Sequence, residues 1–100
     1  MRILLERTGG FAGVKLKATL DEESLPPRQA QHLRKLLEES RFFELPLRIE
    51  APGSRPDRFQ YRLTVENNNG VHTVQAAEEA VSPAMRALLD WLTAEVRRQK

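Results

Sequence analysis

The chain has 100 residues, of which 40% are hydrophobic, 30% are charged and none is cysteine. This length and apolar fraction suffice for one domain with its own core, so we expect a single domain over residues 1–100. The lack of cysteine excludes a disulfide framework, a thiolate metal site and a cysteine nucleophile. The net charge of +2 is the small difference between 16 basic and 14 acidic residues, which are interspersed as on a solvated surface.

No apolar run approaches the roughly 20 residues that span a bilayer, and the apolar start at residues 1–5 is too short for a signal peptide. We therefore expect a cytoplasmic protein that does not enter a membrane.

The first half of the chain predicts two strands and a helix. Residues 3–7 form a short apolar run, and residues 14–20 alternate between apolar and polar side chains, as half-buried strands do. Pro27 suits the first position of a helix, whose apolar stripe is Ala30, Leu33, Leu36 and Leu37. Phe42 and Phe43 follow the helix, and two adjacent rings cannot both lie on its stripe. We expect the chain to turn there and both rings to pack in the core.

The second half repeats this order after a predicted surface loop at residues 50–58 (EAPGSRPDR). Residues 59–65 alternate, and residues 67–70 (NNNG) predict a hairpin turn. This turn would place His72 and Val74 on the same face as Leu63 and Val65. Ser82 is the predicted N-cap of a second helix, with the apolar stripe Met85, Leu88, Leu89, Leu92 and Val96.

Strand, strand and helix therefore occur twice in succession. The simplest arrangement that buries every apolar face is an α+β fold of two layers. We expect a four-stranded, mainly antiparallel sheet with two helices on one face, in the order ββαββα.

The glycines at positions 9, 10 and 13 have three possible uses: to cradle a phosphate, to make a hairpin, or to present Phe11 to a partner. The phosphate role is disfavoured, because no Gly-rich phosphate motif is present and a strand follows instead of a helix. The glycines lie between the two predicted strands, so we expect a hairpin to join them. Whether this hairpin also presents Phe11 to a partner stays open at this point.

Neither metal binding nor catalysis is favoured by the pattern. His32 and His72 are the two histidines, and neither has a partner at ligand spacing, so we expect surface or edge histidines, no metal and no cofactor. A Ser-His-Asp set can be composed from Ser40, His72 and Asp90, but no local motif supports it. We expect that the chain is not an enzyme.

Nucleic-acid binding is the alternative that the charge pattern leaves open. Lys15, Lys17 and Arg62 are predicted on the outer face of the sheet, and an open four-stranded sheet can bind RNA when it offers aromatic rings for stacking. Here the aromatic residues of 59–65 are predicted to point inward. The charges are therefore better explained as a means of keeping an exposed sheet soluble.

A set of landmarks in order along the chain resembles the emfourin family. They are Gly9-Gly10-Phe11-Ala12-Gly13, Leu20-Asp21, Leu25-Pro26, Phe42-Phe43-Glu44-Leu45-Pro46, Pro56-Asp57-Arg58-Phe59-Gln60-Tyr61, Leu63-Thr64-Val65, His72-Thr73-Val74 and the helix from Pro83 to Leu92. The family comprises bacterial protein inhibitors of protealysin-like, that is thermolysin-type, zinc metalloproteases. The resemblance implies an inhibitor whose partner is such a protease, with the zinc belonging to the protease.

Two segments are candidates for the contact with the protease. They supply six candidate contact residues: Gly10, Phe11, Ala12, Pro52, Arg55 and Asp57. Phe11 is the sharpest candidate, because an aromatic side chain in a tight glycine turn does not easily reach its own core and exposed aromatics often anchor interfaces. The alternative for Phe11 is that its ring folds back over the sheet edge.

The alternative function is a small RNA-binding or structural interaction module that uses the exposed sheet face. A monomer and a weak homodimer both stay open, since the exposed edge of the sheet could pair with a second copy.

Overall fold

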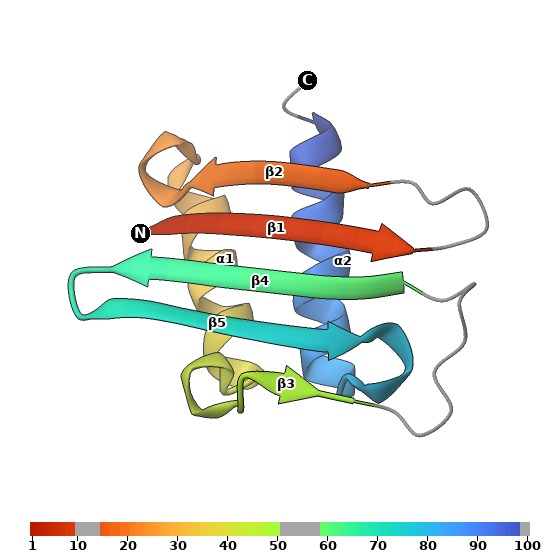
Figure 1. Cartoon of the computed structure of the whole chain (residues 1–100). Coiled ribbons are helices and arrows are strands. Elements are labelled where there is room, and N and C mark those ends of the chain that lie inside the picture. The colour runs from red at the N-terminus through yellow and green to blue at the C-terminus, as the bar shows by residue number, and fades with distance from the viewer. Residues whose placement is uncertain (10–14, 51–58, 99–100) are drawn as a thin grey trace.

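The computed structural model describes residues 1–9, 15–50 and 59–98. They form two layers, with a five-stranded sheet on one side and two helices side by side on the other (Figure 1). The strand order is β2-β1-β4-β5-β3. The strands are β1 (Arg2–Gly9), β2 (Leu16–Asp21), β3 (Arg48–Ile49), β4 (Phe59–Asn67) and β5 (Gly70–Ala77).

Two antiparallel hairpins, β1–β2 and β4–β5, account for four of these strands. Strand β1 also pairs antiparallel with β4, which joins the hairpins in the middle of the sheet. There Leu5 lies opposite Leu63, and Ile3 lies opposite Val65. All four of these side chains are buried, because each faces the helical layer.

The expected four-stranded sheet is wrong by one strand. The short strand β3 pairs in parallel with β5, through Arg48 opposite Gln75 and Ile49 opposite Ala76, so the sheet is mixed. The amide of Gln75 donates to the carbonyl of Leu47 at 2.7 Å, which extends this contact by one residue. A strand of two residues is too short to show the alternation from which the other strands were predicted. The expected α+β class and the placement of both helices on one face are confirmed.

Each helix begins where its sequence predicts. Helix α1 (Pro27–Glu39) starts with Pro27, and helix α2 (Pro83–Arg98) follows Ser82, whose hydroxyl accepts a hydrogen bond from the amide of Met85 at 3.1 Å. A hydroxyl at this position satisfies an amide that has no partner within the helix. Neither helix, nor any other among residues 1–9, 15–50 and 59–98, is long and apolar enough to cross a membrane.

Three short 3₁₀ turns complete the described chain: η1 (Glu22–Ser24), η2 (Phe42–Glu44) and η3 (Glu78–Ala80). Turn η1 is tied to α1 by Arg34, whose Nε lies 2.9 Å from Oε2 of Glu22. The hydrogen bond to Glu22, and then the charge of that carboxylate, raise the pKa of the Arg34 guanidinium above its ordinary value. The pair lies at the surface, so it holds the turn in place more than it stabilises the fold.

The expected turn after α1 occurs at Arg41, which adopts the left-handed conformation with φ 53° and ends the helix. The turn places Phe42 and Phe43 in different surroundings. Phe42 is fully buried, as expected, whereas Phe43 is 47% exposed. Core packing of Phe43 was therefore a wrong prediction, because the two consecutive rings of η2 diverge and meet edge to face, with an interplanar angle of 82°.

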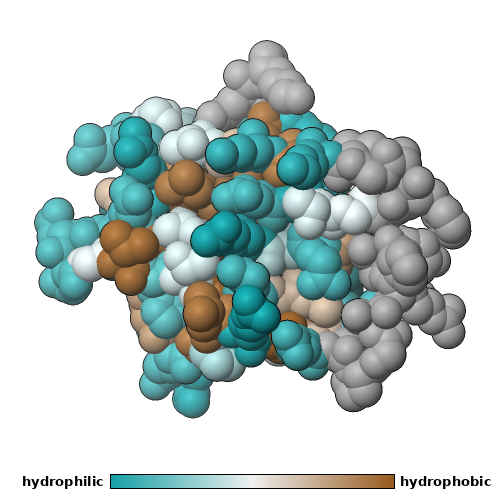
Figure 2. Space-filling view, viewed as in Figure 1, coloured by the Kyte–Doolittle hydropathy of each residue, from teal (hydrophilic) through white to brown (hydrophobic). Residues whose placement is uncertain are grey.

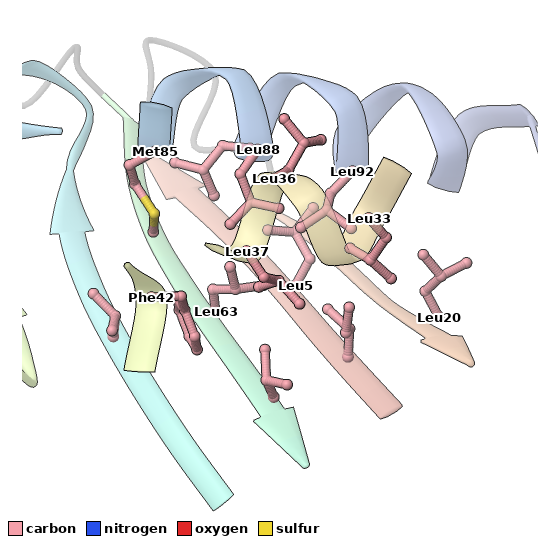
Figure 3. Close-up of a cluster of buried hydrophobic side chains, with 14 of the residues drawn as sticks. Leu5, Leu20, Leu33, Leu36, Leu37, Phe42, Leu63, Met85, Leu88 and Leu92 are labelled. Atoms are coloured by element: carbon pink, nitrogen blue, oxygen red, sulfur yellow. The ribbon is translucent and has the colours of Figure 1, made fainter. Parts of the chain in front are cut away.

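The core fills the space between the sheet and the two helices (Figure 3). The predicted apolar stripes of both helices line one side of the core, and helix-facing side chains of β1, β2, β4 and β5 line the other side. Leu33, Leu88, Leu89, Leu92 and Leu63 are completely shielded from solvent. One acid is also buried: Glu95, whose Oε1 lies 3.3 Å from the Arg98 guanidinium.

The predicted β4–β5 hairpin is confirmed, with Asn67 opposite Gly70. Val65 faces His72 and Leu63 faces Val74, so these four residues share the inner face as expected. Of the turn residues, Gly70 has positive φ, at 134°.

Leu89→Ala tests the docking of α2. The substitution leaves a cavity in the completely buried centre, so it should lower the free energy of unfolding by about 2–5 kcal/mol. Leu47→Ala is a matched control, because Leu47 is 56% exposed and its truncation should change stability by less than about 0.5 kcal/mol. Urea unfolding followed by circular dichroism measures both. Equal losses would show that α2 is not packed as described.

Candidate functional site

The six residues proposed for the protease contact, Gly10, Phe11, Ala12, Pro52, Arg55 and Asp57, lie outside the described residues. The structure does describe the residues that flank them. Gly9 and Lys15 flank segment 10–14, and Glu50 and Phe59 flank segment 51–58. The candidate site is therefore built from these flanks.

All four flanks lie at one end of the sheet (Figure 1). Gly9, the last residue of β1, is paired with Phe59, the first residue of β4. Glu50 follows β3, whose last residue, Ile49, lies opposite Ala76 near the end of β5. Phe59, which follows segment 51–58 in the chain, thus lies directly opposite Gly9, which precedes segment 10–14. We call this end of the sheet, with Arg7, Gly9, Lys15, Glu50 and Phe59, the strand-end site.

Arg7 and Phe59 form the central contact of the strand-end site. The guanidinium carbon of Arg7 lies 4.5 Å from the centroid of the Phe59 ring, close enough for a cation–π interaction. Both side chains are partly buried. The contact links the end of β1 to the start of β4 through side chains as well as through the backbone.

Gly9 has φ 103°, a conformation that side chains with a Cβ rarely adopt. It is the last residue of β1 and immediately precedes segment 10–14, so here a glycine is required by the backbone. The β1–β2 pairing confirms that the glycine-rich stretch joins the two strands of a hairpin. The structure does not describe the tip of that hairpin.

Apart from the partly buried Arg7, the charges at and beside the strand-end site are exposed. Lys15 is exposed, and Arg48 and Glu50 approach to 3.9 Å with most of each side chain in solvent. An exposed pair of this kind contributes little to stability. The site therefore offers a partner mixed charges around a partly buried aromatic ring.

The opposite end of the sheet carries an open cavity of about 400 Å³ lined by the β4–β5 turn and Phe43. His72 forms part of its wall, where its Nε2 lies 3.0 Å from the carbonyl oxygen of Leu45. The ring also meets Phe42 edge to face at 5.3 Å between centroids. His72 is thus half-buried and ties β5 to the chain after η2, whereas a surface or edge histidine was expected.

His32 and Ser40, which were considered from the sequence, make contacts within the fold. The ring of His32 lies against Trp91, and the hydroxyl of Ser40 donates to the carbonyl of Leu37 at 3.0 Å. Among the residues that the structure describes, no three His, Asp or Glu side chains are grouped so that they could hold a metal ion.

No described helix or strand covers the face of the sheet opposite the helices. Lys15, Lys17 and Arg62 are all exposed, as expected. Figure 2 shows this face, where hydrophilic side chains surround isolated hydrophobic ones. The described aromatic residues of β4, Phe59 and Tyr61, belong to the helix-facing set, so among the described strands this face lacks a ring on which a base could stack.

A two-layer α+β domain with one open sheet face, whose candidate segments both adjoin one end of the sheet, has the form of a small binding module. The family model of Emfourin matches residues 5–93, and the chain belongs to this family. The family is one of protease inhibitors, which is consistent with a chain that is not an enzyme. Searches of the curated proteins and of the solved structures gave no significant match.

Sequence reasoning proposed the two candidate segments, which stay a prediction, and it missed the contact between Arg7 and Phe59. Arg7 appeared only as the end of an apolar run, and Phe59 as the first residue of an alternating strand. Their contact depends on β1 lying beside β4, which no local pattern reports, because the Gly9–Phe59 pair joins strand ends from the two halves of the chain.

Gly9→Ala tests the backbone requirement at the strand-end site. A Cβ is strained at positive φ, so the substitution should lower the free energy of unfolding by about 1–3 kcal/mol. Thr8→Ala, one residue earlier in the same strand, should cost no more than about 1 kcal/mol. Thermal unfolding of the two variants compares them. An unchanged midpoint for Gly9→Ala would contradict the positive φ.

Proposed function

We propose that this protein inhibits a thermolysin-like, protealysin-type (M4) zinc metalloprotease by placing segments 10–14 and 51–58 in the protease cleft, with residues 1–100 acting as one domain. Family membership supports the inhibitor role in general. The observation that carries the proposal is the pairing of Gly9 with Phe59, which sets the base of one candidate segment against the base of the other. Because their flanking residues are paired, the two segments are able to contact the same partner at the same time.

Phe11 is the proposed anchor. As the family resemblance implies for the partner, thermolysin-like proteases favour a large apolar residue just after the scissile bond. An inhibitor of such an enzyme needs a narrow element that carries an apolar side chain into that pocket. Residues 9–13 (GGFAG) are narrow, because three of the five lack a Cβ. Gly10 and Ala12 are the proposed backbone contacts on either side of the ring.

Anchoring at both ends reduces the entropic cost of binding. Gly9 is paired in the sheet before segment 10–14, and Leu16 is paired with Arg7 after it. The contact of Arg7 with Phe59, the residue that follows segment 51–58, holds the start of β4 against the same strand. Elements held in place before binding lose less freedom when they bind.

Pro52, Arg55 and Asp57 are the proposed contacts of the second segment. Their side chains offer the protease one rigid apolar ring and two opposite charges for the polar rim of an interface. The zinc in this proposal belongs to the protease, and the inhibitor itself uses neither a metal nor a cofactor. We place this function in the bacterial cytoplasm.

RNA binding on the open sheet face is not proposed. The face carries exposed basic residues, but Glu6 lies between Lys17 and Arg62 in the same row across the strands. Phosphate binding needs a concentration of positive charge, which alternating signs do not provide.

Phe11→Ala is the direct test. If Phe11 fills a pocket of the protease, its truncation should weaken inhibition by about 2 kcal/mol or more in binding free energy, a factor of about thirty. The fold should be unchanged. The measurement is the inhibition constant against a thermolysin-type protease, with circular dichroism to confirm folding.

Phe43→Ala is the matched control, because Phe43 is an exposed phenylalanine at the other end of the sheet. It should inhibit as well as the unmodified protein. Equal potency of Phe11→Ala would move the contact to residues 52–57. Unfolding of Phe11→Ala would instead show that Phe11 belongs to the core.

A further inference from the structure

The outer edge of β2 has no partner among the strands that the structure describes. Among the described strands, β2 pairs only with β1 and stands first in the sheet order. Every second residue of this six-residue strand therefore points its backbone amide and carbonyl groups away from the sheet. Such an edge is a template for pairing with another strand, and its side chains decide which strand fits.

The open face next to this edge carries two rows of alternating charge. In one row, Lys17 of β2 lies opposite Glu6 of β1, which lies opposite Arg62 of β4. In the other row, Asp21 of β2 lies opposite Arg2 of β1, which lies opposite Glu66 of β4. Directly opposed side chains in a sheet are close enough to interact, and opposite charges there are favourable.

At β2 the two rows end in side chains of opposite charge. One ends with the positive Lys17 and the other with the negative Asp21, four residues apart on the same face. Thr19 lies midway between them. A strand with this pattern is complementary in charge to an antiparallel copy of itself.

We propose that the β2 edge binds the β2 edge of a second copy of this chain, antiparallel, with Thr19 opposite Thr19 at the two-fold axis. Lys17 of each copy then lies opposite Asp21 of the other. The two rows join into one continuous series of alternating sign, Arg62–Glu6–Lys17 of one copy followed by Asp21–Arg2–Glu66 of the other. This series occurs twice in the dimer.

The register follows from the pleat of the strand as well as from charge. A shift by one residue would set the helix-facing side chains of one copy against the open face of the other, which is excluded in a continuous two-layer sheet. A shift by two residues keeps the faces matched but leaves either Lys17 or Asp21 opposite Thr19. The other charge then faces Glu23 or Lys15, and both of these residues lie beyond the strand. With Thr19 on the axis, both charges are matched within β2.

The helix-facing side of β2 is compatible with the same register. Ala18 of one copy would lie opposite Leu20 of the other. Ala18 is half-buried in the single chain, whereas Leu20 is buried. Pairing would cover part of the remaining exposed surface of Ala18. Pairing of one strand edge buries little surface area, so the dimer should be weak and reversible.

Asp21 is held in place for this contact. One of its carboxylate oxygens, Oδ1, accepts a hydrogen bond of 3.0 Å from the amide of Glu23, which caps η1. The proposal is independent of the inhibitor function, because it uses only the edge of β2 and the two charge rows beside it.

The test is the oligomeric state of the full chain by sedimentation velocity at low salt, at concentrations up to about 1 mM, where small interfaces associate. We expect a reversible dimer. Lys17→Glu turns both inter-copy contacts from attraction to repulsion and should raise the dissociation constant by about tenfold or more.

Arg62→Glu is the matched control. It makes the same change in net charge and the same repulsive contact with Glu6, but it lies two strands away from the edge. Its dissociation constant should stay within about threefold of the unmodified chain, since it makes no contact across the axis. An equal effect of both variants would overturn the proposal.

Mixing variants tests the register. Lys17→Glu and Asp21→Lys should each dimerise alone with a dissociation constant raised by about tenfold or more. In a mixture, the two substituted positions face each other with opposite charges, and the native Asp21 of one variant faces the native Lys17 of the other. Both pairs are then attractive, so the mixture should dimerise.

Folding of Asp21→Lys, which loses the η1 cap, is checked by circular dichroism. If this variant unfolds, the comparison of Lys17→Glu with Arg62→Glu decides alone. A monomeric unmodified chain at all concentrations, or dimerisation by Lys17→Glu as strong as in the unmodified chain, would overturn the proposal.

Discussion

Strands β1 and β4 lie side by side in the middle of the sheet, and the other elements are attached to this pair. Leu5 faces Leu63 and Ile3 faces Val65, all of them buried. The pairing joins two local hairpins into one surface broad enough to bury the stripes of both helices. Without it, each half would be a hairpin and a helix with too little apolar area to be stable.

The same pairing creates the candidate site. Because Gly9 is opposite Phe59, the two segments proposed to enter the protease adjoin one end of the sheet, although they are remote in the sequence. Both helices lie on one face of the sheet. No described element covers the other face, so its side chains must be compatible with solvent. Alternating charges across β2, β1 and β4 serve this purpose, and at the β2 edge the same pattern supplies the complementarity proposed for a second copy.

The sequence by itself determined those features that short-range patterns encode. The alternation of residues 59–65 and the turn at 67–70 predicted the β4–β5 hairpin. The apolar stripe and the proline of α1 predicted its buried face and its first residue, and Ser82 predicted the cap of α2. Each depends on neighbours within about four residues, where the periods of helix and strand are visible. The family was also recognisable from landmarks along the chain.

The tertiary structure alone decided the features that depend on distant residues. It placed β1 against β4, added β3 to the edge of β5, and put Arg7 over the ring of Phe59. It also separated Phe42, which is buried, from Phe43, which is not, because a left-handed residue at Arg41 redirects the chain. None of these has a local signature, since strand pairing joins residues far apart in the sequence and the free energy that selects it comes from burying the whole face of the sheet at once.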